Sequence, residues 1–454
     1  MLRLRGPYRS PETPSGQPPT GPIQPRDTRA APTRTRVLHP DRRQGKASRT
    51  PEARLEEAVG LAAAIDLDVA GGSVLRLDRP NPGTFFGSGQ VERIAEEVEH
   101  DSIGLVVVDA ALSPVQQRNL ERAWKAKVID RTGLILEIFG ARARTREGQL
   151  QVERAALAYQ RSRLVRSWTH LERQRGGFGF LGGPGESQLE IDRRLIADRI
   201  DHIDRDLERV KRTRVQQRKG RSEPVVALVG YTNAGKSTLF NRLTQAGVFA
   251  ENLLFATLDP TMRRVTLPNG RTFVLSDTVG FISELPTQLV AAFRATLEEV
   301  LEADLILHVR DAAHPDSAAQ REDVRQVLSD LGLDPDEPDR VIEVLNKIDL
   351  LPDDARTALQ EQAARDPALV ALSAVTGVGI DSLFAKLEER LSRGDRVLTL
   401  RLPLSDGATL AWLYAHGQVL SREDHDLEAE LQVRLSHADA ARLEQKLGRN
   451  GGAS

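Results

Sequence analysis

Hydrophobic positions from about residue 53 onward follow the helical and the strand period by turns, a pattern typical of an α/β fold. Beginning with a helix, the pattern predicts alternating helices and strands over residues 55–65, 74–77, 91–98, 105–108, 115–124 and 127–130. Because a helix separates each strand from the next, we expect the strands to pair in parallel. Residues 53–140 are therefore predicted to form a small N-terminal α/β domain.

Two long helices are predicted from coiled-coil spacing of apolar residues. Leucine recurs every seven residues from Leu150 to Leu171, and a second apolar series runs from Ile196 to Val210 at spacings of three and four. Residues 176–185 between them hold six glycines and a proline, through which neither helix can continue. We predict an antiparallel helical hairpin with a glycine-rich tip over residues 141–221.

Strand and helix patterns return after the hairpin. Apolar runs predict strands over residues 225–229, 273–275 and 341–345, so residues 223–393 are predicted to form a domain with a mostly parallel sheet. After it, strand and helix patterns alternate over 397–404, 408–416, 428–435 and 438–447. This pattern predicts a small C-terminal α+β domain at residues 396–448, whose function the sequence does not indicate.

The first 50 residues have a different composition. They hold nine of the 24 prolines, 11 Arg or Lys against three Asp or Glu, and almost no apolar periodicity, which predicts a disordered tail. An Arg-rich, acid-poor start also resembles an organelle transit peptide. The prolines disfavour the amphipathic helix of such a peptide, and the segment lacks the apolar core of a secretory signal.

Whole-chain composition excludes several classes of protein. The 454 residues contain no cysteine, which excludes disulfides, thiolate catalysis and Cys-ligated metal centres. The longest apolar runs fall far short of the roughly 18 residues that a membrane span requires. We expect a cytoplasmic protein without a membrane span, and a monomer.

The net charge of −2 conceals a basic hairpin. Residues 141–221 carry 20 Arg or Lys against 11 Asp or Glu, although the whole chain is slightly acidic. Arginine binds phosphate in bidentate fashion and aromatic rings stack on unpaired bases, so we predict RNA contact. A solvated helix face, a disordered lid or a protein-docking loop remain alternatives. The candidate contacts are Arg173, Arg175, Phe178, Phe180, Arg193 and Arg194.

A phosphate-binding loop follows the strand at 225–229. The segment from Gly230 to Ser237 matches GxxxxGKS between a predicted strand and a predicted helix. The glycines allow backbone N–H groups to converge on phosphate oxygens, while Lys236 adds charge at the β- and γ-phosphates and Ser237 offers a hydroxyl to Mg²⁺.

Three later motifs indicate guanine and a GTPase. Asp277-Thr278-Val279-Gly280 ends one strand and places a carboxylate beside the metal, with a glycine near the γ-phosphate. Asn346-Lys347-Ile348-Asp349 ends another strand, and Ser373-Ala374 follows a third apolar run. Asp349 can accept both the ring N–H and the exocyclic amine of guanine, a pair that adenine lacks. With adenine the carboxylate would be left unpaired, which would weaken nucleotide binding by about 1–3 kcal/mol.

Two positions near these motifs bear on the metal and on hydrolysis. We expect Thr257 to be a second Mg²⁺ ligand in a switch loop, with Thr261 as the competing candidate. Phe281 follows the DxxG motif where signalling GTPases carry a water-orienting glutamine. An apolar side chain cannot orient water, so the hydrolytic residue stays unassigned and we expect slow intrinsic hydrolysis that a partner accelerates.

A weaker glycine pattern lies in the N-terminal domain. Gly87-Ser88-Gly89 precedes a predicted helix, but Glu92 stands where a third glycine of a dinucleotide fingerprint would lie. We interpret it as an ordinary turn. A second nucleotide or RNA contact, and with it ATP-driven RNA remodelling, remains an alternative.

The sequence resembles the HflX family of ribosome-associated GTPases, a sister group of the Obg GTPases, over residues 53–447. The resemblance rests on the segment Gly182–Arg194, the loop Gly230–Ser237 and the segment Phe255–Pro260. It implies an N-terminal α/β domain, a helical hairpin and a GTPase domain, with the large ribosomal subunit and its rRNA as partner. It also implies GTP-dependent separation of stalled or vacant ribosomes into subunits, often under stress.

The resemblance also implies the nucleotide contacts. They carry over to Gly230, Tyr231, Thr232, Asn233, Ala234, Gly235, Lys236, Ser237, Phe255, Ala256, Thr257, Leu258, Asp259, Asp277, Thr278, Val279, Gly280, Asn346, Lys347, Ile348, Asp349, Ser373, Ala374 and Val375. Mg²⁺ would lie on Ser237 and Thr257. Asn233 is similar to the asparagine that binds potassium in cation-dependent relatives, so K⁺ activation is a hypothesis. An alternative to the ribosome-splitting enzyme is a GTP-switched rRNA-binding adaptor in which hydrolysis is incidental.

Overall fold

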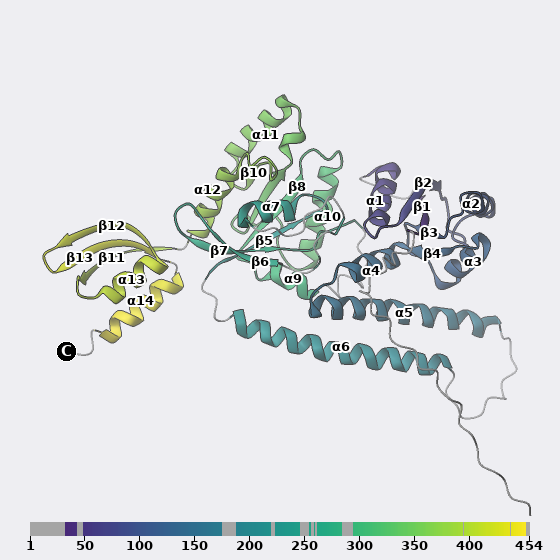
Figure 1. The fold of residues 1–454 in the computed structure, drawn as a ribbon, viewed down its shortest axis with the longest axis horizontal. Helices are drawn as coiled ribbons and strands as arrows, with labels where there is room; N and C mark the ends of the chain where they lie inside the picture. The colour runs from purple at the N-terminus through teal and green to yellow at the C-terminus, as the bar shows by residue number, and fades with distance from the viewer. Residues whose placement is uncertain are drawn as a thin grey trace, which may run out of the picture. The chain divides into compact units, whose positions relative to one another are not determined.

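The computed structural model describes residues 32–42, 49–174, 188–218, 223–245, 254–255, 258, 261–283, 294–393, 395–435 and 437–450. The strands among them form three sheets (Figure 1).

The N-terminal sheet has four parallel strands in the order β2-β1-β3-β4. Its elements are β1 (Arg34–Asp41), α1 (Pro51–Ala63), β2 (Asp68–Arg76), α2 (Ser88–His100), β3 (Leu105–Val108), α3 (Pro114–Trp124), β4 (Lys127–Asp130) and α4 (Arg131–Arg142). The predicted alternation of helices and strands and their parallel pairing are confirmed. Because the chain passes from β1 to β2 on one side and then to β3 on the other, the topology switches between β1 and β3.

Strand β1 corrects the sequence interpretation. Residues 1–50 were expected to be a tail, and this expectation is wrong for Arg34–Asp41, which pairs with both β2 and β3. Val37 and Leu38 are fully buried. Composition averaged over 50 residues concealed an eight-residue strand whose backbone groups are satisfied only by neighbours distant in the sequence. The sheet therefore begins at Arg34 rather than at residue 53.

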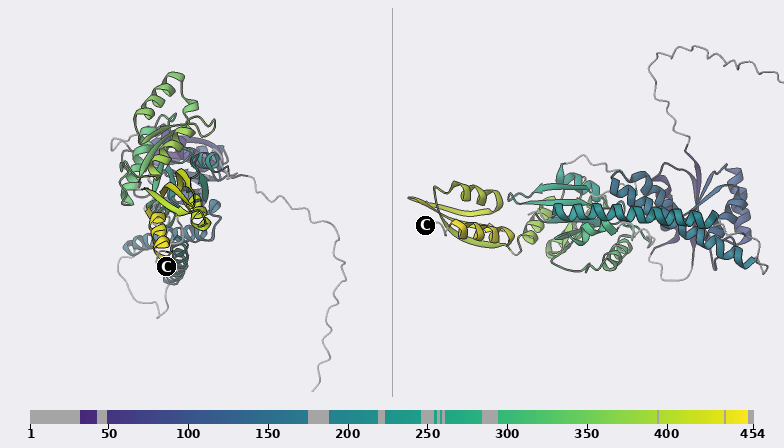
Figure 2. Two further views of the ribbon diagram at one scale, coloured as in Figure 1. Left: turned by 90° about the vertical axis from the view of Figure 1, so that its left-hand side faces the viewer. Right: turned by 90° about the horizontal axis from the view of Figure 1, so that it is seen from below.

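Helices α5 (Arg146–Gln174) and α6 (Gln188–Arg218) lie side by side (Figures 1 and 2). Arg199 pairs with Glu153 at 2.7 Å, and Arg214, further along α6, pairs with the earlier Glu147 at 2.7 Å. The later residue of α6 pairs with the earlier residue of α5, so the two helices run antiparallel, as predicted. Leu150, Ile200 and Ile203 of the predicted seams are buried. The tip, with Arg175, Phe178 and Phe180, lies outside the described residues.

The central sheet has six strands in the order β10-β9-β8-β5-β7-β6, all parallel except β6. Its elements are β5 (Val225–Gly230), α7 (Lys236–Thr244), β6 (Thr261–Thr266), β7 (Thr272–Asp277), α9 (Arg294–Leu301), β8 (Leu305–Asp311), α10 (Ser317–Asp330), β9 (Val341–Asn346), the 3₁₀ turn η1 (Ile348–Leu350), α11 (Asp353–Arg365), β10 (Leu369–Ala371) and α12 (Ile380–Leu391). Parallel pairing brings the carboxyl ends of β5, β7, β8, β9 and β10 to one edge.

The C-terminal sheet is antiparallel in the order β11-β13-β12. Its elements are β11 (Arg396–Pro403), α13 (Gly407–His416), β12 (Gln418–His425), β13 (Glu428–Leu435) and α14 (His437–Asn450). Both helices cover one face, where Leu431, Val433, Leu413 and Leu443 are fully buried (Figure 1). The predicted α+β fold is confirmed. Strand β12 escaped prediction because it is an edge strand whose side chains are mostly exposed and polar.

The central position of β1 can be tested with matched leucine truncations. Leu38→Ala is expected to lower the free energy of unfolding by about 2–5 kcal/mol, because it empties a fully buried site. Leu427→Ala removes the same atoms from a side chain that is 81% exposed and should change it by no more than about 0.5 kcal/mol. Urea denaturation followed by circular dichroism measures both. Equal stability of the two variants would contradict the placement of β1.

Candidate nucleotide site

The candidate phosphate loop connects β5 to α7, as predicted. Gly230 ends the strand, and Lys236 is the first residue of the helix. Gly235 has a φ of 92°, and a Cβ there would lie 2.2 Å from Nδ2 of Asn346. Only glycine fits, because any side chain would meet this amide. The loop is thus held closely against the end of β9.

Lys236 points into the loop rather than into solvent. Its Nζ donates hydrogen bonds to the carbonyl oxygens of Gly230, at 3.1 Å, and Tyr231, at 2.9 Å. Burial lowers the pKa of Lys236 to about 8, and the charge of Asp277 opposes this shift. Among the described residues, the hydrogen bonds of this buried ammonium group go to neutral carbonyls, which it can exchange for phosphate oxygens, which carry charge.

Ser237 and Asp277 meet at the metal position that the sequence predicts. The Ser237 hydroxyl donates to Oδ2 of Asp277 at 2.7 Å, and Asp277 is fully buried at the end of β7. A hydroxyl and a carboxylate are hard oxygen donors of the kind that Mg²⁺ prefers, so the residues fit that ion. Thr257, Ala256 and Asp259 lie outside the described residues, and the competing Thr261 begins β6 opposite Asp277.

The predicted base-recognition motif lies at the same edge. Asn346 donates to the carbonyl oxygen of Ala234 at 2.9 Å and accepts from the amide of Ala374 at 3.0 Å. It thereby joins the phosphate loop to the Ser373-Ala374 segment. Oδ1 of Asp349 is buried and has no hydrogen-bond partner among the residues that the structure describes. An orphaned carboxylate oxygen at this place fits the N–H donors of a guanine edge.

The remaining predicted contacts have mixed surroundings. Phe255 and Leu258 are buried among hydrophobic residues, whereas Val375 is 67% exposed. The Lys347 ammonium pairs with Asp311 at 2.7 Å. Phe281 is only 3% exposed and pairs through its backbone with the phosphate loop. It therefore presents no polar side chain that could orient water.

Sequence reasoning missed a set of buried polar residues on the other side of Tyr231. Glu57 of α1 accepts hydrogen bonds from Arg49, from Arg131 and from the Tyr231 hydroxyl. Ser283, two residues after Phe281, also belongs to this set. No local motif marks them, because Arg49 falls in the predicted tail and the others lie on unrelated elements.

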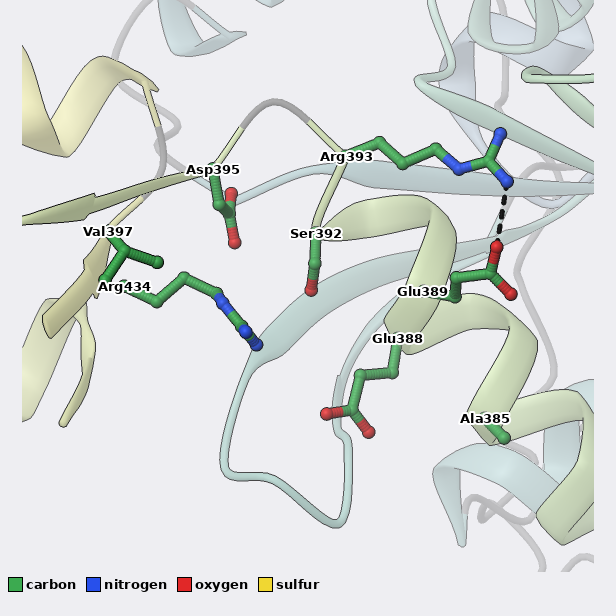
Figure 3. Close-up of a pocket in the computed structure, with 8 residues that line it drawn as sticks. All are labelled: Ala385, Glu388, Glu389, Ser392, Arg393, Asp395, Val397 and Arg434. Carbon is green, nitrogen blue, oxygen red and sulfur yellow. Dashed lines mark hydrogen bonds and ion pairs between the residues drawn. The ribbon is translucent and has the colours of Figure 1, made fainter. Parts of the chain in front are cut away.

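Two other features do not belong to this site. The amide of Gly87 donates to Oε1 of Gln90 in an N-terminal cap, which favours the turn interpretation of that glycine pattern. An open cavity of 570 Å³ (Figure 3) lies beside α12 and includes none of the predicted nucleotide residues. Its lining is mostly charged, and there Arg393 pairs with Glu389 at 2.8 Å. The predicted nucleotide residues lie at the strand edge and not at this cavity.

A parallel sheet with the phosphate loop, the metal pair and the base motif along one edge defines a P-loop GTPase. Family models match successive segments and describe them as GTP-binding GTPase N-terminal (residues 52–140), GTP-binding GTPase middle region (142–221), 50S ribosome-binding GTPase (225–347) and HflX C-terminal domain (358–453).

Curated relatives agree with these matches. The GTPase HflX of Magnetococcus marinus is 52% identical over 87% of this chain and 91% of its own length. The GTPase HflX of Escherichia coli is 50% identical over 80% of this chain and 85% of its own length. The chain belongs to the HflX family of GTPases and hydrolyses GTP. Within the described ranges, no helix combines the length and the apolar character that crossing a membrane would need.

Base recognition can be tested at Asp349. Asp349→Asn is expected to weaken GTP binding by about 1–3 kcal/mol, since an amide can no longer accept from both guanine donors. It should strengthen binding of xanthosine triphosphate, whose 2-oxo group can accept from the new amide. Asp353→Asn, an exposed change on α11, is the control and should alter neither affinity. Calorimetry with both nucleotides decides, and unchanged GTP affinity of Asp349→Asn would remove this carboxylate from the base pocket.

Proposed function

We propose that GTP binding and hydrolysis drive this chain on and off the large ribosomal subunit in the cytoplasm, and that it separates stalled or vacant ribosomes into subunits. The observation that carries the proposal is the hairpin of α5 and α6, which forms ion pairs with Asp130 at the end of β4 and with Glu299 of α9. Such a hairpin can pass a change at the nucleotide to a distant surface.

One set of contacts joins the hairpin to the N-terminal sheet. The Tyr159 hydroxyl donates to Oδ1 of Asp130 at 2.7 Å, and Arg163 pairs with the same carboxylate at 3.2 Å. Asp130 ends β4 and caps α4 through the amide of Gly133 at 2.8 Å. Burial and the charge of Asp130 raise the pKa of Tyr159, so its hydroxyl stays a donor at neutral pH.

A second contact joins the hairpin to the central sheet. Arg214 of α6 pairs with Glu147 of α5 at 2.7 Å and with Glu299 of α9 at 3.5 Å. Glu299 in turn accepts from the Ser276 hydroxyl, next to Asp277. A displacement of Asp277 on metal or phosphate binding therefore has a short route to the base of the hairpin.

The basic surface of the hairpin is the proposed RNA contact. Arg193 and Arg194 are exposed near the start of α6. Together with Arg173, Arg175, Phe178 and Phe180 they would bind rRNA phosphates and unpaired bases.

At the nucleotide we propose the contacts that the sequence indicates. Backbone amides of residues 230–237 and the Lys236 ammonium would hold the phosphates, Ser237 and Thr257 would hold Mg²⁺, and Asp349 would recognise guanine. Asn233 would contribute to a K⁺ site. Because Phe281 is apolar and buried, we propose that the ribosome orders the switch segments or supplies the polar group needed for fast hydrolysis.

Cosedimentation with purified ribosomes tests the partner. With GTP, the chain is expected to pellet with large subunits, and deletion of residues 176–185 should weaken this binding by about tenfold or more because the base stacking on Phe178 and Phe180 is lost. Unchanged affinity of the deletion variant for free GTP is the control. Equal cosedimentation of both proteins would remove the tip from the mechanism.

The same ribosomes distinguish splitting from occupancy. If the chain separates subunits with a non-hydrolysable GTP analogue, binding suffices for one round and hydrolysis serves recycling. If it binds without separating subunits under any nucleotide, the adaptor alternative is correct and the splitting proposal is wrong.

Turnover measurements test the missing water-orienting group. Free protein is expected to hydrolyse GTP slowly, and ribosomes should raise kcat by about a hundredfold, within the range that a positioned catalytic group supplies. Replacing KCl with NaCl should reduce turnover if Asn233 contributes to a K⁺ site. Maximal hydrolysis by the free protein would refute the first expectation, and equal rates in the two salts would refute the second.

A further inference from the structure

Glu57 is a buried carboxylate at the meeting point of three elements. Its side chain is 6% exposed, and Arg49 and Arg131, at 4% and 8%, pair with it at 2.5 Å and 2.8 Å. The Tyr231 hydroxyl donates to it as well. A carboxylate from α1 thus holds a residue of the phosphate loop.

The segment after the DxxG motif is tied to the same carboxylate. The Ser283 hydroxyl donates to Oε1 of Glu57 at 3.1 Å, and the Ser283 amide donates to the Tyr231 hydroxyl at 2.9 Å. The Ser283 carbonyl accepts from Arg131 at 2.7 Å. All three polar groups of Ser283 therefore bond to residues of this cluster.

Phe281 and Gly280 lie directly on the phosphate loop as a result. The amide of Phe281 donates to the Gly230 carbonyl at 3.0 Å, and its carbonyl accepts from the Thr232 amide at 2.7 Å. A Cβ on Gly280 would lie 2.8 Å from Cγ2 of Thr232 and 3.1 Å from Nζ of Lys236. The DxxG glycine therefore lies so close to Thr232 and Lys236 that a Cβ would not fit, on the side where a terminal phosphate would enter.

Apolar packing holds the segment from the same side. Phe281 and Ile282 belong to a buried cluster with Leu61 of α1 and Phe139 of α4. The Phe139 ring meets Phe255 edge to face, with centroids 4.8 Å apart. Residues of the N-terminal α/β region therefore share one buried hydrophobic cluster with the segment.

The buried charges of the Glu57 cluster disfavour any state in which only some of its ion pairs are broken. Burial alone would raise the pKa of Glu57, but the charges of Arg131 and Arg49 outweigh it and lower the pKa below its usual value. Glu57 is therefore ionised at neutral pH. Loss of one partner would leave a buried charge uncompensated, so the segment is either held by the whole set or released from it.

We propose that Glu57 is a positioning residue of the GTPase cycle, which holds residues 281–283 on the phosphate loop in a conformation that admits GDP and that the terminal phosphate of GTP must open. The inference rests on the proposed nucleotide site. It assigns to the N-terminal region a share in distinguishing GTP from GDP. The cluster lies at the carboxyl edge of the N-terminal sheet near the switch between β1 and β3, where α/β sheets commonly hold ligands. In this chain the side chain of Arg131 and the backbone of Ser283 lie at that position and bond to each other.

Two variants test the proposal by calorimetry with GDP and with a non-hydrolysable GTP analogue. Glu57→Gln removes the charge that both arginines need, and Tyr231→Phe removes only the hydroxyl that donates to Glu57 and accepts from the Ser283 amide. Each should raise the affinity for the GTP analogue relative to GDP by about tenfold, because a hydrogen bond to a charged group no longer opposes opening. Glu97→Gln breaks the ion pair between Arg36 of β1 and Glu97 of α2 in the same domain and is the control.

The outcomes separate this inference from the nucleotide site itself. An unchanged ratio of the two affinities in Tyr231→Phe, with GDP still bound, overturns the positioning role and leaves the site intact. Failure of the unaltered chain to bind GDP overturns both. Tyr231→Phe keeps the buried ring, so it decides the question even if Glu57→Gln unfolds. A changed ratio in Glu97→Gln would show that any lost ion pair in the sheet has this effect, and would overturn the specific role of Glu57.

Discussion

The carboxylate of Glu57 is the interaction on which the contact between the N-terminal sheet and the phosphate loop depends. It lies between two guanidinium groups and a tyrosine hydroxyl, all largely withdrawn from water. Asp109 completes the set, since it pairs with Arg131 at 2.5 Å and with His39 at 2.7 Å. Buried ion pairs gain little over an apolar core, but removal of one partner leaves an uncompensated buried charge and is strongly destabilising. The cluster therefore contributes geometry more than stability.

Parallel strand pairing positions the residues of the candidate nucleotide site and of the Glu57 cluster. It gathers the carboxyl ends of β5, β7 and β9 at one edge, and with them Gly230, Asp277 and Asn346. The same rule places His39 and Asp109 at the carboxyl edge of the N-terminal sheet. Tyr231 connects the two edges because its backbone belongs to the phosphate loop while its hydroxyl reaches Glu57.

Each nucleotide motif could be found from the sequence because it is short and contiguous. Backbone geometry around the phosphate requires Gly235 and Lys236 at fixed spacing, so the residues of the phosphate loop all lie within an eight-residue segment. The helices of the hairpin could also be predicted from the sequence, because their apolar residues recur at regular spacing over many turns. The cluster around Glu57 had no such signal, since its members, from Arg49 to Ser283, come from different segments and their contacts follow no local motif. Strand β1 was not predicted for a related reason, because its pairing with β2 and β3, rather than its own composition, defines it as a central strand.

The sequence by itself predicted the order of most elements, the phosphate loop with its candidate metal and base motifs, and the antiparallel pairing of two long helices. These features depend on local spacing, which periodicity and steric limits fix within a few residues. Only the tertiary structure decided that β1 is central, that the segment after DxxG rests on the phosphate loop, and that Arg49 and Glu57 reach Tyr231. These contacts join residues far apart in the chain, and their energy depends on burial and charge pairing that exist only once the chain has folded.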